Sequence, residues 1–527
     1  SAQAAPTSTG SITVSGTVAS SYDAYQIFSA NVVDGDSDAK IATDLTWAND
    51  AARDAALPVL HSAGMPNSQT TAQEAAEWLN TDSHLTSALS AQLARSLQSS
   101  GAEPVALNAG TAAELPCGYW LIVAKDDAIA QGEAGTAPIM ALVGGSAVTV
   151  KPKAATPKVA KHVLEDSTAA WGKAADATVA DDLYWRLSAT VPAGLTAYDT
   201  YAVQFVDTMS AGLDPSKVAA SMRVYVAAGA DGGFDAVPTG KDGHADTEPA
   251  KGWTDITAQC VTKMAADGTF TVRTGDLIAA LGGADAFTAG ARVVAVYNAP
   301  LSSACSHGIA KGNPNEVYLR YPRSPFADQS GDAGFTRTPS DDACAYTWDL
   351  ALTKRGSDGD KPLAGAVLSI ADDRGRTLAA DGTWDAEGKA TVTTGEDGRV
   401  TVSGVDSGKL KVRELKAPKG YTAFEGARSV TVKAEGLDVD QVAAAKPKLT
   451  ITAESPLRAD SADGSTGSLE ASLINTPTGT PPSITTGGFM PSTGDMAMYA
   501  AAAAAVAGAA LIVVALLVKR GGGSHKE

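Results

Sequence analysis

The stretch "LKVRELKAPKGYTAF", residues 410–424, places an acid where a hydrocarbon side chain is expected. In an extended strand alternate side chains share a face, so Leu410, Val412 and Glu414 point the same way. The opposite face carries Lys411 and Arg413, and a Pro-Lys-Gly turn follows. The pattern predicts a β-strand that buries one glutamate among apolar neighbours, directly before a turn.

Length and composition restrict the class of protein. With 527 residues the chain is too long for one hydrophobic core, so three or four domains are expected. Its net charge of -18 argues against nucleic-acid binding, which needs a basic face. No HExxH, GxSxG or P-loop motif is present, so we expect neither a turnover enzyme nor a cofactor. The acidic turn "DGDSDAK" (34–40) lacks the ligand spacing of an EF-hand, which favours a solvated loop over a metal site.

An uncharged run, 496–518, lies near the C-terminal end and is followed by Lys519 and Arg520. As an α-helix it would be about 34 Å long, enough to cross a bilayer. The basic pair is expected on the cytoplasmic side. The sequence begins with small residues and no methionine, which is typical of a chain that has lost a signal peptide. We therefore expect the part before the run to be extracellular.

Segment patterns divide that extracellular part into domains. Helical spacing within 46–100, between strand-like stretches, predicts an α+β domain at the N-terminal end. Beyond a Pro/Lys-rich junction at 151–163, short strands alternate with Gly/Asp/Pro turns, which predicts β-sandwiches and a mainly β fold class. The expected order is an N-terminal domain 1–153, a middle β-sandwich 154–342, a second β-sandwich 343–476, a Thr/Pro/Gly linker 477–489, a short motif 490–494, a transmembrane helix 496–518 and a cytoplasmic tail 519–527.

The short motif consists of Met490, Pro491, Ser492, Thr493 and Gly494. Followed by a hydrophobic span and a basic tail, it resembles the LPxTG-type sorting signal of Gram-positive surface proteins. The resemblance implies that sortase cleaves between the threonine and the glycine and transfers the threonine carboxyl group to an amine. Methionine stands where the family has leucine.

Further stretches resemble the isopeptide-forming fimbrial (pilin) proteins of Gram-positive bacteria. They are "YDAYQIFSANV" (22–32), "LPCGYWLIVA" (115–124), "YAVQFVDTMSAGL" (201–213), "GNPNEVYLRY" (312–321) and "KAPKGYTAF" (416–424). The resemblance implies tandem immunoglobulin-like β domains, with 343–476 as a collagen-adhesin B-type domain and the helical segment 46–100 as a decoration of the first domain. It also implies a secreted, cell wall-anchored fimbrial protein that supports cell adhesion.

The opening stretch resembles the E-box of these proteins, whose glutamate promotes an amide bond between a lysine and an asparagine of one domain. The residues that match these three roles are Glu414, Lys354 and Asn475. Apolar burial would depress the pKa of the lysine and raise that of the acid, as attack of an amine on an amide requires. Leu410 and Leu415 depart from the usual tyrosine and threonine of the E-box. The alternative is an ordinary, partly buried ion pair between Lys354 and Glu414.

The middle domain of the family uses a lysine, an aspartate and an asparagine in a YSNNP-like strand. Lys161 and Asp207 match the first two, whereas the third place reads "YPRSP" (321–325) and contains no asparagine. We therefore expect no isopeptide bond in the middle domain and only an ion pair between Lys161 and Asp207.

Four cysteines, Cys117, Cys260, Cys305 and Cys344, allow three pairings. An extracellular location is compatible with disulfides. Cys305 and Cys344 bracket the strand that lacks the asparagine, which favours this pair, and free buried thiols are the alternative.

Pilus polymerisation in the family uses a lysine after a VYPK-like motif at the end of the first domain. The stretch "VTVKPKAATP" (148–157) puts Lys153 at that place and Lys151 where the tyrosine would be. Lys158 and Lys161 lie close by, so the choice of lysine stays open. The alternative is a solvated basic linker.

Two function classes remain. A backbone pilin would be joined by sortase from Thr493 to Lys153 of an identical subunit and finally to peptidoglycan. A monomeric wall-anchored adhesin, or an ancillary subunit at the tip or base of a pilus, would instead bind a host surface ligand. Before sorting, either would contact the membrane through its C-terminal helix.

Overall fold

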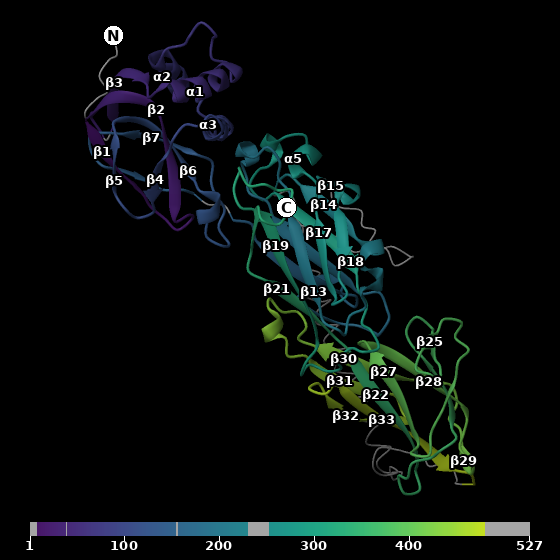
Figure 1. Cartoon of the computed structure of the whole chain (residues 1–527). Coiled ribbons are helices and arrows are strands. Elements are labelled where there is room, and N and C mark those ends of the chain that lie inside the picture. The colour runs from purple at the N-terminus through teal and green to yellow at the C-terminus, as the bar shows by residue number, and fades with distance from the viewer. Residues whose placement is uncertain (1–7, 38, 154–155, 230–251, 480–527) are drawn as a thin grey trace, which may run out of the picture.

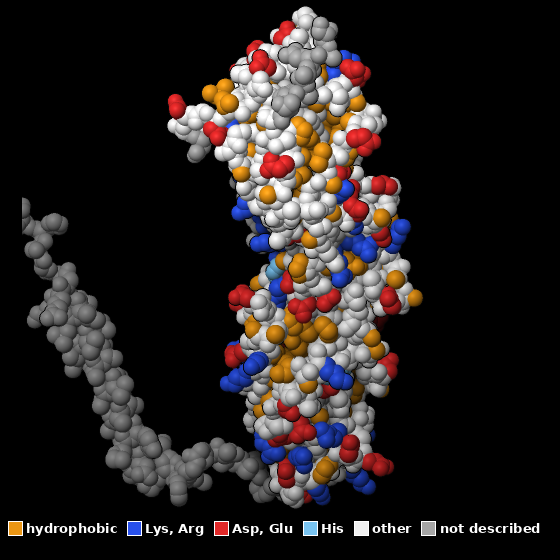
Figure 2. All heavy atoms as spheres, turned by 60° about the vertical axis from the view of Figure 1, so that its left-hand side comes forward, with side chains coloured by type: hydrophobic (Ala, Val, Ile, Leu, Met, Phe, Trp, Pro, Cys, Tyr) orange, Lys and Arg blue, Asp and Glu red, His pale blue; other side chains and the backbone are white. Residues whose placement is uncertain are grey.

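Three successive domains form the part of the chain that the structure describes. The computed structural model describes residues 8–37, 39–153, 156–229 and 252–479. The domains follow one another end to end and give an elongated molecule (Figure 1). Acidic and basic side chains are interspersed along the visible face (Figure 2). The predicted mainly β architecture is confirmed.

The first domain combines two sheets with a layer of helices. The smaller sheet has the order β5-β1-β8 and contains β1 (Thr9–Val14), β5 (Ala113–Pro116) and β8 (Val148–Val150). The larger has the order β3-β2-β6-β7, with β4 beside β2, and contains β2 (Ser21–Asp34), β3 (Lys40–Trp47), β4 (Val105–Asn108), β6 (Gly118–Ala124) and β7 (Ile139–Val143). One apolar core lies between the two sheets, and a second lies between the larger sheet and the helices.

The helices of the first domain fall within the segment whose spacing predicted them. They are α1 (Asp50–Ser62), α2 (Ala72–Asn80) and α3 (Ser87–Ser99). The side chains of Asn49, Thr71 and Thr86 each accept a backbone N–H bond at the start of one helix. These N-caps supply acceptors for N–H groups that have no partner within the helix, and so they fix where each helix begins.

The middle domain is a sandwich of two sheets. One has the order β10-β9-β12-β18-β14-β15 and contains β9 (Val159–Glu165), β10 (Ala170–Gly172), β12 (Tyr184–Thr190), β14 (Arg223–Ala227), β15 (Trp253–Asp255) and β18 (Arg292–Asn298). The other has the order β11-β21-β19-β13-β17-β16, with β20 beside β19, and contains β11 (Ala174–Asp176), β13 (Gln204–Met209), β16 (Val261–Met264), β17 (Thr269–Arg273), β19 (Asn313–Pro322), β20 (Phe335–Arg337) and β21 (Asp341–Tyr346). Two short helices, α4 (Val218–Ser221) and α5 (Leu277–Ala280), lie in its connections.

The C-terminal domain is also a two-sheet sandwich. One sheet has the order β27-β22-β33-β29, with β32 beside β33, and contains β22 (Trp348–Gly356), β27 (Arg399–Val405), β29 (Tyr421–Thr422), β32 (Leu457–Asp463) and β33 (Ser468–Pro477). The other has the order β25-β24-β23-β28-β30-β31, with β26 beside β23, and contains β23 (Val367–Ala371), β24 (Thr377–Leu378), β25 (Trp384–Asp385), β26 (Val392–Thr393), β28 (Gly408–Lys416), β30 (Ala427–Glu435) and β31 (Lys448–Ala453). The first strand, β22, and the last, β33, are parallel neighbours.

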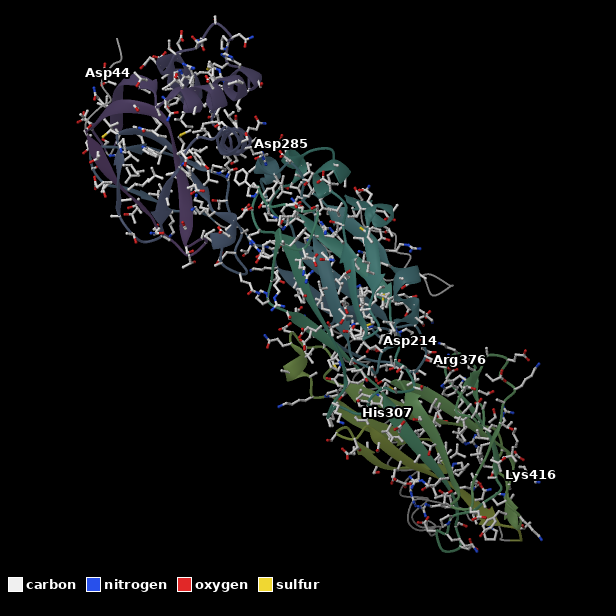
Figure 3. The ribbon with its side chains drawn as sticks, in the orientation of Figure 1. Asp44, Asp214, Asp285, His307, Arg376 and Lys416 are labelled. Atoms are coloured by element: carbon white, nitrogen blue, oxygen red, sulfur yellow. The ribbon has the colours of Figure 1, made fainter. Side chains whose placement is uncertain are left out.

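The middle and C-terminal domains meet around one buried carboxylate, that of Asp176. Its Oδ2 accepts hydrogen bonds from Trp348 Nε1 at 2.6 Å and from the backbone N–H and the hydroxyl of Ser407 at 3.0 and 2.6 Å. Arg376, which Figure 3 labels at this junction, donates to both carboxylate oxygens of Asp181 at 2.6 and 2.8 Å. Polar contacts from three separate segments of the C-terminal domain therefore tie it to the middle one.

The predicted motif 490–494, transmembrane helix 496–518 and cytoplasmic tail 519–527 lie outside the described residues, as does the predicted linker beyond residue 479. Within the described ranges no helix has the length and apolar character needed to cross a membrane.

The Asp176 junction yields a stability prediction. Asp176→Ala leaves the buried Trp348 N–H without its acceptor, so the free energy of unfolding should fall by about 2 kcal/mol. Asp176→Asn keeps an acceptor oxygen and should lose clearly less. Urea denaturation followed by tryptophan fluorescence measures both. An equal loss in the two variants would show that the hydrogen bonds of Asp176 do not stabilise the junction.

Candidate functional site

Glu414 lies where the alternation of its strand predicts. On β28 the side chains of Leu410, Val412 and Glu414 face the core and are 6%, 0% and 6% exposed. Lys411 and Arg413 face solvent. The glutamate therefore sits in the apolar interior between the two sheets of the C-terminal domain.

The structure brings Lys354 and Asn475 to this glutamate. The two come from the parallel neighbours β22 and β33, in which Lys354 lies opposite Leu473 and Gly356 lies opposite Asn475. Both side chains are buried. Asn475 Nδ2 donates to Glu414 Oε1 and Oε2 at 2.8 and 3.0 Å, and Lys354 Nζ lies 3.9 Å from Oε1.

Two backbone groups hold these side chains in place. The Lys354 amine donates to the Leu473 carbonyl at 3.1 Å. The Phe424 N–H, from the turn after β28, donates to Glu414 Oε2 at 3.1 Å. The turn after β28 thus supplies a fixed donor to the acid, and the neighbouring strand supplies an acceptor that orients the amine.

Burial prepares the amine for reaction. It lowers the pKa of Lys354 to about 8, although the charge of Glu414 opposes the shift. A neutral amine is the nucleophilic form, and with this pKa about a tenth of the amine is neutral at pH 7, far more than at the ordinary value of 10.5. The carbonyl oxygen of Asn475, Oδ1, is buried and has no hydrogen-bond partner within the described part of the chain. An acid that gave it a proton or a hydrogen bond would activate the amide for attack.

A second buried lysine–acid pair lies in the middle domain. Lys161 on β9 and Asp207 on β13 form an ion pair between fully buried side chains. The Tyr297 hydroxyl lies 2.9 Å from Lys161 Nζ and 3.0 Å from Asp207 Oδ2. Burial lowers the pKa of Lys161 to about 8 against the pull of Asp207, and burial raises the pKa of Asp207. Both shifts favour the neutral forms of the pair.

An asparagine from outside 321–325 completes this second site, which removes the reason for expecting no isopeptide bond in the middle domain. Asn315 on β19 lies opposite Met209, and Val317 lies opposite Asp207, so Asn315 and Asp207 are diagonal neighbours on one face. Asn315 is fully buried, and its Nδ2 donates to the Tyr297 hydroxyl at 2.9 Å. The site therefore contains a lysine, an acid and an amide, as in the C-terminal domain.

The signal that would have found Asn315 is the same alternation that places Glu414. Asn315, Val317, Leu319 and Tyr321 share the buried face of β19. The segment 321–325 begins at the far end of this strand, which ends at Pro322. There the Tyr321 hydroxyl donates to the Gly132 carbonyl of the first domain at 2.7 Å, so these residues build a domain junction instead.

The favoured disulfide between Cys305 and Cys344 is not formed, and both residues are free thiols. Cys305 packs in the core of the middle domain, whereas Cys344 belongs to the core of the C-terminal domain. The Cys305 sulfur lies 3.6 Å from His307 Nε2. Cys117 and Cys260 are free as well.

The lysines near the first junction differ in accessibility. Lys161 is fully buried, which excludes it as a nucleophile for another molecule. Lys153 and Lys158 are exposed. Lys153 and Lys151 line a groove of about 500 Å³ between the first and middle domains, formed by the start of α3 and the segments 134–140 and 192–198. A peptide segment could reach Lys153 in this groove.

Part of the C-terminal domain matches a known family. Residues 349–446 match the family model described as "SpaA: Prealbumin-like fold domain", which covers Lys354 and Glu414 and ends before Asn475. The Trypsin-resistant surface T6 protein of Streptococcus pyogenes serotype M6 is 32% identical over 120 residues, 21% of this chain and 20% of that protein. The chain thus matches about a fifth of the length of this curated relative.

Solved structures resemble the chain over most of its length. The T6 backbone pilin of serotype M6 Streptococcus pyogenes has a TM-score of 0.48 and 17% identity, covering 89% of this chain and 98% of that chain. The full-length major pilin SpaD of Corynebacterium diphtheriae has a TM-score of 0.42 and 15% identity, covering 89% and 98%.

The lowered pKa of Lys354 predicts that the free energy of unfolding depends on pH. The variant Asn475→Ala makes this dependence measurable, because its amine stays free. The folded pKa is about 8 and the ordinary value is 10.5. Between these values the folded state binds fewer protons than the unfolded state, so stability rises with pH by up to about 3 kcal/mol. Urea denaturation at a series of pH values measures this rise. The double variant Lys354→Met/Asn475→Ala should lose it, and an unchanged rise would assign it to other groups.

Proposed function

We propose that this chain is a structural subunit of a covalently assembled pilus: a secreted, wall-anchored backbone pilin of immunoglobulin-like domains that supports adhesion. The observation that carries the proposal is the meeting of Lys354, Glu414 and Asn475 in one apolar core. The match of 349–446 to the SpaA prealbumin-like family supports it, as does the sequence identity with the T6 surface protein.

The reaction proposed for this core is an intramolecular amide transfer. Lys354 Nζ attacks Cγ of Asn475, a C–N bond forms, and the bond from Cγ to Nδ2 breaks. Glu414 takes the proton that the amine loses and gives it to the departing nitrogen, which leaves as ammonia. Its carboxylate already contacts that nitrogen at 2.8 and 3.0 Å. The glutamate acts once, on its own domain.

Such a bond would stabilise the domain by restricting its unfolded state. It closes a loop between β22 and β33 that includes nearly the whole domain. By analogy with a disulfide, a loop of that length contributes about 4–5 kcal/mol. It would also carry tension between the first and last strands, which hydrogen bonds alone resist poorly.

We infer a second bond of the same kind between Lys161 and Asn315, with Asp207 as the acid. It replaces the expectation that the middle domain has no crosslink, because that expectation depended on a missing asparagine. The lysine, acid and amide are buried together, and the amine and the acid both have pKa values shifted toward their neutral forms. The same chemistry can therefore proceed in two domains of one chain.

Polymerisation would join a threonine late in the sequence to a lysine at the junction of the first and middle domains of the next subunit. Sortase would cleave between Thr493 and Gly494 and join the threonine carboxyl group to Lys153 of the next subunit. Lys153 is the proposed acceptor because it holds the place of the family's linking lysine and is exposed in the groove between the first and middle domains, which Lys151 lines as well. The last subunit would be transferred to peptidoglycan.

The intact mass of the purified extracellular part tests the internal bonds. The wild type should weigh less than its calculated mass by two molecules of ammonia, because each bond releases one. Glu414→Ala and Asn475→Ala should each fall short of their own calculated mass by only one ammonia, because the Lys354–Asn475 bond is lost. Asn315→Ala should also fall short by only one, because the Lys161–Asn315 bond is lost. Peptide mapping assigns each loss to its site. A wild type at the full calculated mass would overturn both bonds.

Co-expression with the cognate sortase tests polymerisation. The wild type should give a ladder of covalent multimers on denaturing gels, and Lys153→Arg should abolish it because the accessible amine is lost. Lys158→Arg is the matched control, since it removes a neighbouring exposed lysine. A full ladder from Lys153→Arg would show that another lysine is used. A wild type that reaches the wall only as a single band would favour the monomeric adhesin or ancillary subunit.

A further inference from the structure

A tyrosine occupies the centre of the middle-domain site. Tyr297 lies on β18, opposite Trp185 in the pairing of β12 and β18, and is 0% exposed. Its ring packs edge-on against Phe270, with 4.9 Å between centroids and planes 79° apart. Packing in the core therefore fixes where its hydroxyl points.

That hydroxyl contacts all three groups of the proposed reaction. It lies 2.9 Å from Lys161 Nζ, 3.0 Å from Asp207 Oδ2 and 2.9 Å from Asn315 Nδ2. A phenol donates one hydrogen bond and accepts two. The ammonium and the amide nitrogen are donors and the carboxylate is an acceptor, so the three contacts use its full capacity.

The C-terminal site has a different arrangement. There the carboxylate of Glu414 contacts the amide nitrogen of Asn475 directly. Asp207 is one methylene shorter, and among the described residues its hydrogen bonds go to Lys161 and Tyr297 and not to Asn315. The tyrosine hydroxyl fills the distance between the shorter acid and the nitrogen that must leave.

Two buried oxygens in the middle site have no hydrogen-bond partner among the residues that the structure describes: Oδ1 of Asp207 and Oδ1 of Asn315. If Asp207 carries a proton, its Oδ1 can donate a hydrogen bond. The deprotonated oxygen has no neighbouring donor, within the described ranges, from which to accept one. Burial raises the pKa of Asp207, which favours that proton. Burial also raises the pKa of Tyr297 well above its ordinary value, so the phenol stays protonated and can pass a proton on.

We propose that Tyr297 is a catalytic residue of the middle-domain crosslinking reaction, which relays a proton from Lys161 to the leaving nitrogen of Asn315. The proposal rests on the Lys161–Asn315 bond of the proposed function. The neutral amine attacks Cγ of Asn315, the Nζ–Cγ bond forms and the Cγ–Nδ2 bond breaks. The proton that Nζ loses passes through the Tyr297 hydroxyl and Asp207, and Nδ2 gains one proton and leaves as ammonia. Tyr297 and Asp207 end in their starting forms.

The test compares Tyr297→Phe with the wild type during cell-free synthesis of the extracellular chain, by intact mass and peptide mapping over time. The variant keeps the ring and removes only the hydroxyl. Formation of the Lys161–Asn315 bond should slow by about 100-fold, as for loss of a general acid–base group. The Lys354–Asn475 bond of the same molecule is the internal control and should form at the wild-type rate.

A second variant guards against loss of folding. In Asp207→Glu/Tyr297→Phe the longer acid reaches the amide nitrogen as Glu414 does, so the crosslink should return. Asn315→Ala provides the reference urea midpoint for a folded, uncrosslinked middle domain. A double variant that folds to this midpoint and stays uncrosslinked would overturn the relay.

The outcomes separate this inference from the proposed function. If the wild type forms the Lys161–Asn315 bond and Tyr297→Phe forms it equally fast, the role of Tyr297 alone is refuted. If the wild type never forms the bond, the middle-domain part of the proposed function fails, and the role of Tyr297 fails with it.

Discussion

Burial of a lysine amine beside an acid and an amide is the constraint on which the two sandwich domains depend. Lys354 and Lys161 are both fully buried, and taking a charged amine out of water costs several kcal/mol unless its partners are well placed. The partners come from both sheets. Glu414 approaches Lys354 from the opposing sheet, and Asp207 and Asn315 approach Lys161 in the same way. The partners of each lysine therefore meet it only when the two sheets pack in the correct register. The burial of one side chain thus depends on the fold of the whole domain.

The two clusters meet the same chemical requirement with different side chains. In the C-terminal domain one glutamate lies beside both the amine of Lys354 and the amide nitrogen of Asn475. In the middle domain the acid is one methylene shorter, and Tyr297 provides the additional reach. The two lysine–asparagine pairs also differ in position. Lys354 and Asn475 lie on neighbouring strands of one sheet, whereas Lys161 and Asn315 lie on opposite sheets. A bond in the first case joins two adjacent strands, and a bond in the second joins the two layers of the sandwich.

Alternation along single strands explains most of what the sequence could predict. It placed Glu414 on the buried face from residues 410–414 alone, and helical spacing located the helices within 46–100. The same alternation puts Asn315 on the buried face of its strand. The family resemblance pointed instead to 321–325, which contains no asparagine. Contacts between domains leave no periodic pattern in the sequence. Asp176 meets Trp348 and Ser407 across 172 and 231 residues, and no local period encodes a partner at that separation. The prediction of a disulfide between Cys305 and Cys344 failed for a related reason. Spacing in the sequence does not reveal that the two sulfurs belong to different cores.

The positions of the proposed bonds determine which segments would carry load in a pilus. In the C-terminal domain a pulling force enters at Trp348, follows β22 to Lys354, crosses to Asn475 and leaves along β33, so the residues between the two bonded positions are bypassed. In the middle domain the force enters along β9 and crosses from Lys161 to Asn315 near the start of β19. The segment from 316 to 347 follows that bond and stays in the load path. It is held by the ladder between β19 and β21, by the pairing of β21 with β11 and by the Asp176 junction. Because these contacts are noncovalent, the passage from the middle to the C-terminal domain is where such a subunit would extend first under tension.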